Sequence, residues 1–309
     1  MLTKRAVIAA KLEGTEGTAE TLAAADADVL VFEPSFSPTI TMNERTETHD
    51  SLSPFAQVAG SRMATIAFSV NLRGSGAAGT APKIGKLLKA CRLGETIVAS
   101  TSVTYAPISV SIPSLTMALY RDGVKKQIRG ARGNVTYSGK AGEPGILNFS
   151  FQGVYDGVTD VSLLTGTGIE TTNLPVLLSA ALTIASFAAK ISSISFDMGN
   201  KLAMRADINK AEGYFSCMIT GGSPKGNFDP EEELVSAHDW YGKFKAGTSG
   251  ALTFQHNGGA GNICTISAPV VQYTGVAESS RDDIAALGVD FALARSAAAG
   301  NDEISVAFT

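Results

Sequence analysis

Residues 115–155 read LTMALYRDGVKKQIRGARGNVTYSGKAGEPGILNFSFQGVY, and this stretch decides the fold class. Apolar runs flank the dipeptide Asp122-Gly123, which is the strongest short signal for a β-hairpin. A second turn is expected at residues 142–145, where Gly, Glu, Pro and Gly follow one another. The stretch therefore predicts an antiparallel β-meander. Its strands are expected at residues 115–120, 124–128, 135–138 and 146–155.

The second half of the chain repeats the order of elements in the first half. In the first half, an alternating run at residues 65–72 precedes a Gly-rich loop and a helix expected from Pro82. In the second half, a strand at 214–220 precedes a Gly-rich loop at 221–228 and a helix expected from Pro230. Strands are then expected at 252–255, 263–267, 270–276 and 284–294, with a polar break at 281–283. We interpret this as a tandem duplication, with an insertion between the helix and the hairpin of the first copy.

The expected organisation has four parts. These are an N-terminal arm (residues 1–35), a first domain (36–160), a linker (161–175) and a second domain (176–309). The arm is rich in Ala and Thr and lacks the apolar stripe of a core helix. The linker is expected where several Gly residues interrupt the pattern of strands. Each domain is expected to be mainly β, with one helix packed on it.

Composition excludes several classes of protein. The 25 basic and 29 acidic side chains give a net charge of −4, so there is no basic surplus to hold nucleic-acid phosphates. Charged residues make up only 17% of the 309 residues, against roughly 25% in typical soluble domains. Part of the surface is therefore expected to be covered by partners. The 3 Cys and 3 His share no metal-ligand spacing, and an odd number of Cys indicates no disulfide framework.

No targeting or membrane segment is expected. Lys4 and Arg5 precede a short apolar run, but Lys11 and Glu13 follow too soon for a signal peptide. The uncharged stretch 171–189 contains polar residues and a Pro and is too short for a membrane span. The sequence therefore predicts a soluble protein made in the cytoplasm.

One motif has the form of a dinucleotide-binding loop. Residues 74–79 read GSGAAG after an expected strand, and Glu95 follows about 20 residues later, as that mechanism requires. However, Pro82 removes an amide from the helix start, and a β-meander follows in place of alternating strands and helices. The corresponding loop of the second copy lacks the motif. We therefore expect a flexible loop and no cofactor.

Three further groups of residues contain side chains of the types found in functional sites. Glu231 to Glu233 suit the start of a helix with Asp229 as its N-cap, and His238 suits packing on that helix. A basic patch at residues 129–133, extended by Lys125 and Lys126, suits a phosphate, an acidic neighbour, a solvated face or a subunit contact. No catalytic, cofactor-binding or metal site is expected.

Several phrases resemble one protein family. Residues 120–135 (YRDGVKKQIRGARGNV) and 141–155 (AGEPGILNFSFQGVY) are similar to the central hairpins of tail tube proteins of long non-contractile-tailed bacteriophages and prophages. Similar phrases of the second half lie at residues 195–200 (SFDMGN), 219–234 (ITGGSPKGNFDPEEEL), 267–273 (SAPVVQY) and 300–308 (GNDEISVAF). The resemblance covers roughly residues 60–309.

The resemblance implies a fold and a structural function. Each domain would be a β-sandwich with a flanking helix, whose strands join those of neighbours into a closed barrel around a channel. Simple members place one domain per chain in a ring of six. Two copies per chain therefore imply a homotrimeric, pseudo-hexameric ring in the phage tail tube, with loops and the N-terminal arm stacking ring on ring.

The resemblance also implies partners and a location. The chain would contact itself, a tape measure protein in the lumen, and tail terminator and distal tail proteins, in a virion tail assembled in the host cytoplasm. Phage DNA would pass without specific binding, so acidic residues are expected to outnumber Lys and Arg on the lumen strands. The alternatives are an extracellular β-sandwich binding module such as an adhesin and, on the Gly motif alone, a dinucleotide-binding oxidoreductase.

Overall fold

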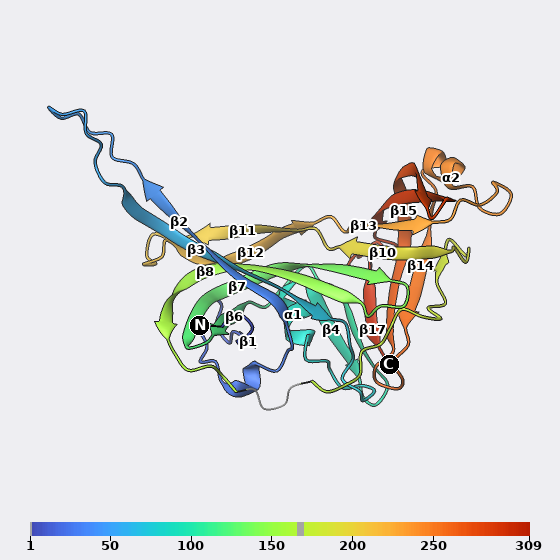
Figure 1. Ribbon diagram of the computed structural model, residues 1–309, viewed down its shortest axis with the longest axis horizontal. Coiled ribbons are helices and arrows are strands. Elements are labelled where there is room, and N and C mark those ends of the chain that lie inside the picture. The colour runs from blue at the N-terminus through green and yellow to red at the C-terminus, as the bar shows by residue number, and fades with distance from the viewer. Residues whose placement is uncertain (1, 166–169) are drawn as a thin grey trace.

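The computed structural model describes residues 2–165 and 170–309, and strands dominate them (Figure 1). The mainly β architecture expected from the sequence is confirmed. The first half contains β1 (Ala6–Leu12), the 3-10 helix η1 (Ala24–Asp26), β2 (Phe32–Asn43), β3 (Val58–Asn71), α1 (Gly85–Ala90), β4 (Leu93–Val98), β5 (Ser102–Pro107), β6 (Leu115–Arg121), β7 (Val124–Lys140) and β8 (Ile146–Asp160). The second half contains β9 (Thr183–Ile184), β10 (Ile191–Asp197), β11 (Asn200–Ala206), β12 (Tyr214–Gly222), β13 (Lys225–Pro230), α2 (Trp240–Ala246), β14 (Ser249–His256), β15 (Cys264–Arg281), β16 (Ile284–Ala294) and β17 (Ser305–Phe308).

The order of strands in the first half recurs in the second half. The order β2-β3-β8-β7-β6 corresponds to β10-β13-β16-β15-β14, and every pairing in it is antiparallel. We call these two sets the first and second copies. They belong to one 15-stranded sheet because β10 pairs directly with β7, with Phe196 opposite Tyr137. We call this pairing and the contacts around it the copy junction.

Turn chemistry placed two hairpins correctly. Asp122 and Gly123 both have positive φ (44° and 100°) between Arg121 and Val124, which are paired. Asp282 and Asp283 also have positive φ (50° and 63°) and join β15 to β16. Such two-residue turns match the twist of the flanking strands. The two strands expected between residues 124 and 138 are a single bulged strand, β7.

Alternating side chains divide the shared sheet into an apolar and a polar face. In β8, Leu147, Phe149 and Phe151 are buried, whereas Asn148 and Ser150 between them are exposed. This period of two follows from the pleat, which directs successive side chains to opposite faces. The apolar face therefore carries the core, and the polar face stays open.

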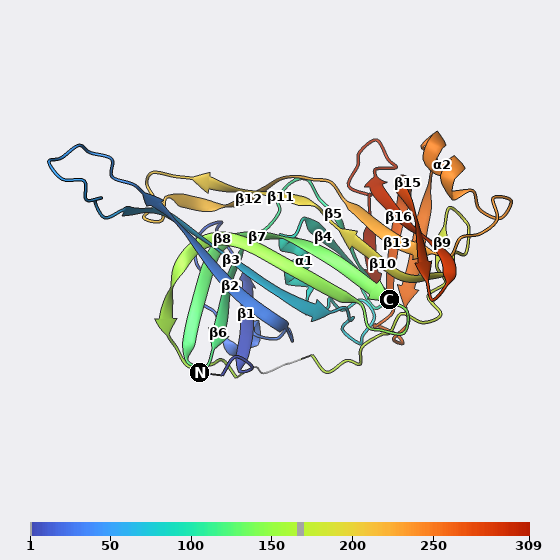
Figure 2. The same ribbon diagram turned by 45° about the horizontal axis from the view of Figure 1, so that its top comes forward.

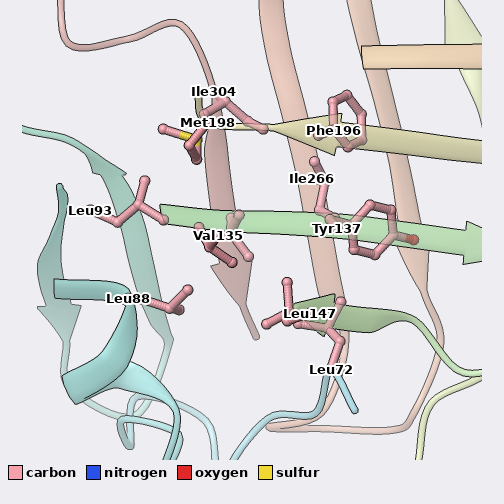
Figure 3. A pocket seen from close by; sticks show the side chains of 11 residues that line it. Leu72, Leu88, Leu93, Val135, Tyr137, Leu147, Phe196, Met198, Ile266 and Ile304 are labelled. Carbon is pink, nitrogen blue, oxygen red and sulfur yellow. The ribbon is translucent and has the colours of Figure 1, made fainter. Parts of the chain in front are cut away.

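A single hydrophobic cluster contains residues of both copies. At its centre, Leu88 and Val135 of the first copy face Met198 and Ile304 of the second across an apolar cavity of about 40 Å³ (Figure 3). An apolar cavity of this size stays dry. The copies therefore share part of one core, and their division at the expected linker stays a prediction; residues 166–169 of that linker lie outside the described residues.

The insertion of the first copy receives the C-terminal strand of the second copy. It forms the hairpin β4–β5, and β17 pairs with β5, with Val306 opposite Tyr105. β17 also pairs with β15, so it links the insertion to the second copy. At the other end of the chain, β1 pairs with β6, and Ile8, Ala9 and Ala10 are buried. Part of the expected N-terminal arm is thus a strand of the first copy.

Each copy carries a long hairpin, and the two hairpins have different surroundings. The β2–β3 hairpin of the first copy projects away from the body, with residues 44–57 at its tip (Figures 1 and 2). The hairpin of the second copy runs from β10 through β11, returns through β12 to β13, and lies along the first copy. There the amide of Arg62 donates to the carbonyl of Glu212 at 2.9 Å.

The helix expected from Pro230 is a wrong prediction. Residues 225–230 form the strand β13, in which Pro230 lies opposite Ile191, and α2 begins ten residues later with Asp239 as its N-cap. Asp229 caps no helix, because its carboxylate accepts hydrogen bonds from the amides of Ser192 and Ser193. The Gly-rich loop expected at 221–228 is likewise mostly strand. In the first copy, α1 begins at Gly85, three residues after Pro82.

The stretch considered as a membrane span forms no helix. Residues 171–189 are irregular apart from the two residues of β9 and isolated bridges. Among the helices in residues 2–165 and 170–309, none combines the length and the apolarity needed to cross a bilayer.

Candidate functional site

The polar face of the shared sheet crosses the copy junction. Its members are short polar side chains with few charges, which the pleat places on one side of six strands. They are Ser69 of β3, Asn148 and Ser150 of β8, Thr136 and Ser138 of β7, Ser195 and Asp197 of β10, Lys225 and Asn227 of β13, and Asp290 of β16. A groove of about 520 Å³ lies along this face at the junction.

Hydrogen bonds between neighbouring strands hold these side chains against the sheet. Ser69 Oγ donates to Asn148 Oδ1 at 2.7 Å, and Asn148 Nδ2 donates to Thr136 Oγ1 at 3.3 Å. In the second copy, Ser195 Oγ donates to Asn227 Oδ1 at 2.8 Å. Side chains that bond to one another offer fewer free donors and acceptors to other molecules. The polar face is thus a hydrogen-bonded surface of mostly uncharged side chains.

One such bond crosses from the first copy to the second. Asn134 Nδ2 donates to Asp197 Oδ1 at 2.7 Å, next to the β7–β10 pairing. The groove lining contains two carboxylates, Asp197 and Asp290, against one ammonium group, Lys225. Acidic groups therefore outnumber basic groups in this groove.

The sheet has an unpaired edge in each copy. Among the described residues, β2 pairs only with β3, and the part of β15 beyond Gln272 pairs only with β16. The corresponding part of β7, residues 136–140, pairs with β10. At the copy junction, such an edge thus pairs with the first strand of the following copy. The β15 edge is available to pair with an equivalent strand.

The basic patch expected at residues 129–133 is part of the copy junction. Arg132 is 7% exposed and donates to the carbonyl oxygens of Ile112 and Cys217 and to Glu16 Oε1, the last at 2.7 Å. Arg129 pairs with Asp156 at 3.1 Å and with Glu212 at 2.5 Å. Of the hypotheses for this patch, the structure supports the acidic neighbour. The carboxylates come from the N-terminal segment, from β8 and from the hairpin of the second copy.

Glu16 is the central anion of this junction. It accepts hydrogen bonds from Arg132 and from Ser216 Oγ of the second copy, at 2.7 Å each. Burial acts to raise the pKa of Glu16, but these hydrogen bonds and the charges of Arg132 and Arg205 outweigh it and hold the pKa below its ordinary value. Glu16 therefore stays ionised at neutral pH and ties the N-terminal segment to both copies.

A comparison with protein-family models identifies the family of the chain. A family model described as phage tail tube protein matches residues 3–309, essentially the whole chain. The chain belongs to the phage tail tube protein family. No curated protein matches it. The resemblance noted in the sequence is therefore confirmed, and with it a structural component of the virion that assembles into a tube with other tail proteins.

The Gly motif of this tail tube protein serves backbone packing between the copies. The amide of Gly74 donates to Asn262 Oδ1 at 2.7 Å, and a Cβ on Gly74 would lie 2.2 Å from the carbonyl oxygen of Gly261. The amide of Gly76 donates to the same carbonyl at 3.1 Å. These amides are turned toward the second copy, so the loop forms no phosphate cradle.

Gly261 provides a test of this contact. We expect Gly261→Ala to lower the free energy of unfolding by roughly 3 kcal/mol, because φ is 74° there and the new Cβ would lie 2.2 Å from the amide nitrogen of Ala77. The matched control is Gly259→Ala, where φ is 84° but no atom lies within 4 Å of the new Cβ, so a loss of about 1 kcal/mol is expected. Urea denaturation measures both, and equal losses would contradict the account.

The remaining candidate residues have structural surroundings. Glu231 pairs with Arg281 at 3.1 Å, and Glu233 pairs with Lys190 at 3.0 Å. His238 is buried and stacks on Phe187, with ring centroids 4.7 Å apart. Within residues 2–165 and 170–309, no three His, Cys, Asp or Glu side chains are grouped to hold a metal ion.

A buried tyrosine–histidine pair at the copy junction was not anticipated from the sequence. Tyr137 Oη of the first copy lies 2.6 Å from His256 Nε2 of the second, and His256 is fully buried. Burial lowers the pKa of His256 from its ordinary 6.5 to about 4, and it raises the pKa of Tyr137. The two residues are 119 positions apart, so no local pattern could have paired them.

The pKa of His256 predicts a loss of stability in acid. Between pH 6.5 and about 4 the unfolded chain binds a proton on His256 that the folded chain does not, so the free energy of unfolding falls by roughly 3 kcal/mol over this range. Thermal or urea unfolding from pH 7 to 4 measures the decline. His256→Gln, which keeps a polar partner for Tyr137, is expected to reduce this decline; an unchanged pH profile in that variant would argue against the assignment.

Proposed function

We propose that this chain polymerises into stacked rings that form the phage tail tube, with three chains in each ring. The observation that carries the proposal is the copy junction, in which the edge of one copy is filled by the first strand of the next. Within residues 2–165 and 170–309, an edge of each kind is still unpaired, on β2 and on β15. A head-to-tail contact between such edges generates a ring when the rotation closes. Two copies in each of three chains would fill six equivalent positions.

The polar face would line the channel. The opposite face carries the shared core, so the polar face is the surface of the sheet that stays open to solvent. Its short uncharged side chains and its small acidic excess would let DNA pass, because attractive contacts with phosphates would slow ejection. In the empty tube the same surface would hold a tape measure protein.

Further contacts would join rings to one another and to other tail proteins. Residues 44–57, at the tip of the β2–β3 hairpin, extend beyond the body of the molecule and suit contact with an adjacent ring (Figure 2). The last rings of the tube would meet tail terminator and distal tail proteins. Assembly would take place in the host cytoplasm before DNA delivery into a new cell.

The mass of the purified assembly tests this function. Three chains of 31.9 kDa make a ring of about 96 kDa, which light scattering after size exclusion resolves from monomer and hexamer. Electron microscopy of the same sample should show hollow rings or tubes. Discrete monomers at every concentration would contradict the proposal and favour the alternative of a β-sandwich binding module.

A further inference from the structure

The two α-helices among the described residues occupy equivalent places but differ in burial. Each precedes the last three strands of its copy, and their C-caps are Cys91 and Gly247. When the two C-caps are aligned, Leu88 of α1 and Phe244 of α2 occupy equivalent positions. Leu88 is 2% exposed, whereas Phe244 is 39% exposed. Four of the six residues of α1 are buried, but only Trp240 of the seven in α2.

Residues of the second copy cover α1. Met198 and Ile304 face Leu88 across the small apolar cavity (Figure 3). Beside them, Asn200 Nδ2 donates to the carbonyl of Cys91, the C-cap of α1, at 2.9 Å. Met198 follows the last residue of β10, and Asn200 is the first residue of β11; we call residues 198–200 the β10–β11 bend. The start of one long hairpin therefore covers the helix of the neighbouring copy.

In the equivalent segment of the first copy, Phe36 packs on Tyr155 of its own chain, with ring centroids 6.2 Å apart, whereas Ile40 and Met42 beyond it are exposed. Ser35 of β2 corresponds to Asp197 of β10, because each precedes the outward part of its hairpin. Ser35 lies opposite Ala67 of β3, and Asp197 lies opposite Lys225 at the equivalent position of β13. By this alignment, Phe36 corresponds to Met198, and Pro38 corresponds to Asn200. The segment Ile40-Thr41-Met42 then corresponds to Leu202-Ala203-Met204.

Apolar side chains are exposed both on the β2 segment and around α2. Ile40 and Met42 are 41% and 50% exposed, whereas Leu202 and Met204 are half-buried. The surface around α2 exposes further apolar side chains, which are Leu234 (78%), Val235 (70%), Tyr241 (42%), Phe244 (39%) and Ile284 (48%). We call this set the α2 patch. It lies at the opposite end of the molecule from the β2–β3 hairpin, so the two cannot meet within one chain (Figure 1).

We infer that the α2 patch is the docking surface for residues 36–42 of a second copy of this chain. The contact repeats, between chains, the packing of the β10–β11 bend on α1 within one chain. This contact rests on the proposed function, since it would belong to the same interface between chains of a ring as the pairing of the β15 edge. Phe244 is the central residue on one side, and Ile40 and Met42 lie on the other.

A charge on each side tests the inference. Phe244→Glu and Ile40→Glu are each expected to reduce the fraction of protein in rings at least tenfold, measured by sedimentation. Ile97→Glu is the matched control, because Ile97 is also a half-exposed apolar residue (51%) but lies on β4, and it should assemble as the wild type does. Circular dichroism would confirm that all three variants are folded.

A crosslink tests the same contact without disturbing it. Ile40→Cys combined with Phe244→Cys should give a ladder of covalently joined chains after oxidation, since the three native Cys are buried. Ile40→Cys combined with Ile97→Cys should give none. If the wild type forms rings but Phe244→Glu assembles normally and the ladder is absent, the inference is overturned and the proposed function stands. If the wild type forms no rings, the proposed function itself fails.

Discussion

Arg132→Ala is expected to lower the free energy of unfolding by roughly 3–5 kcal/mol. The side chain is almost fully buried and bonds to the N-terminal segment, to the first copy and to the second copy at once. Its removal would leave the Glu16 carboxylate and the Cys217 and Ile112 carbonyl oxygens without this partner inside the protein. Loss of one partner of a buried ion pair has this magnitude, because the remaining charge keeps its desolvation cost.

Urea denaturation of two further variants separates the roles of charge and geometry. Arg132→Lys keeps the charge but cannot reach the two carbonyls and the carboxylate together, so an intermediate loss is expected. Arg45→Ala removes an arginine whose ion pair with Glu47 is exposed, and it should change stability by less than about 1 kcal/mol. A loss below about 1 kcal/mol for Arg132→Ala would contradict the role of this residue in joining the copies.

Two lysines on the polar face are expected to convert the channel into a DNA-binding surface. Ser138→Lys with Asn227→Lys would add two positive charges per chain, or six for each ring of three chains. Neutralised phosphates release counterions, so a short duplex should be retained by assembled tubes at about 50 mM salt and released by about 200 mM, with a change in affinity of roughly a thousandfold. Wild-type tubes should retain none.

The matched control places the same charges away from the polar face. Val98→Lys with Thr101→Lys adds two lysines at the exposed turn between β4 and β5. Tubes of this variant should show at most weak binding to their outer surface, which added nuclease would remove. DNA in the polar-face variant should be protected from nuclease. If both variants hold DNA equally and without protection, the polar face does not line a channel.

The parts of the fold that were predictable depend on local chemistry. Asp122-Gly123 and Asp282-Asp283 occupy positive φ in two-residue turns, and the strands beside them were placed closely, β16 at its full extent. The repeat was visible because the order of turns and strands is a local signal that occurs twice. The mainly β fold follows from these signals together, whereas the tail tube family was indicated by the resemblance of short phrases to its members.

The misplaced helix shows where local chemistry is insufficient. Asp229, Pro230 and three Glu residues have the composition of a helix start. In the folded chain, however, the carboxylate of Asp229 is bound by amides 36 and 37 residues away and by Arg281, 52 residues away. These long-range partners stabilise β13 as a strand between β10 and β16. No pattern within a short window contains them.

The candidate site was only partly predictable for the same reason. The acidic excess and the low charge were visible in the composition. The copy junction was not, because Tyr137 and Phe196 are paired across 59 positions of sequence that include the expected linker. The basic residues of the patch were evident in the sequence, but their role was not, because their acidic partners come from β8, from an N-terminal segment and from a hairpin of the other copy.

A reconstruction of the assembled protein by electron cryomicroscopy tests the central claim most directly. It should show rings of three chains around an open channel, with Thr136, Ser195 and Asn227 facing the lumen and β2 of one chain beside β15 of the next. A channel lined by another face of the sheet, or an assembly in which the β2 and β15 edges do not meet, would contradict the account.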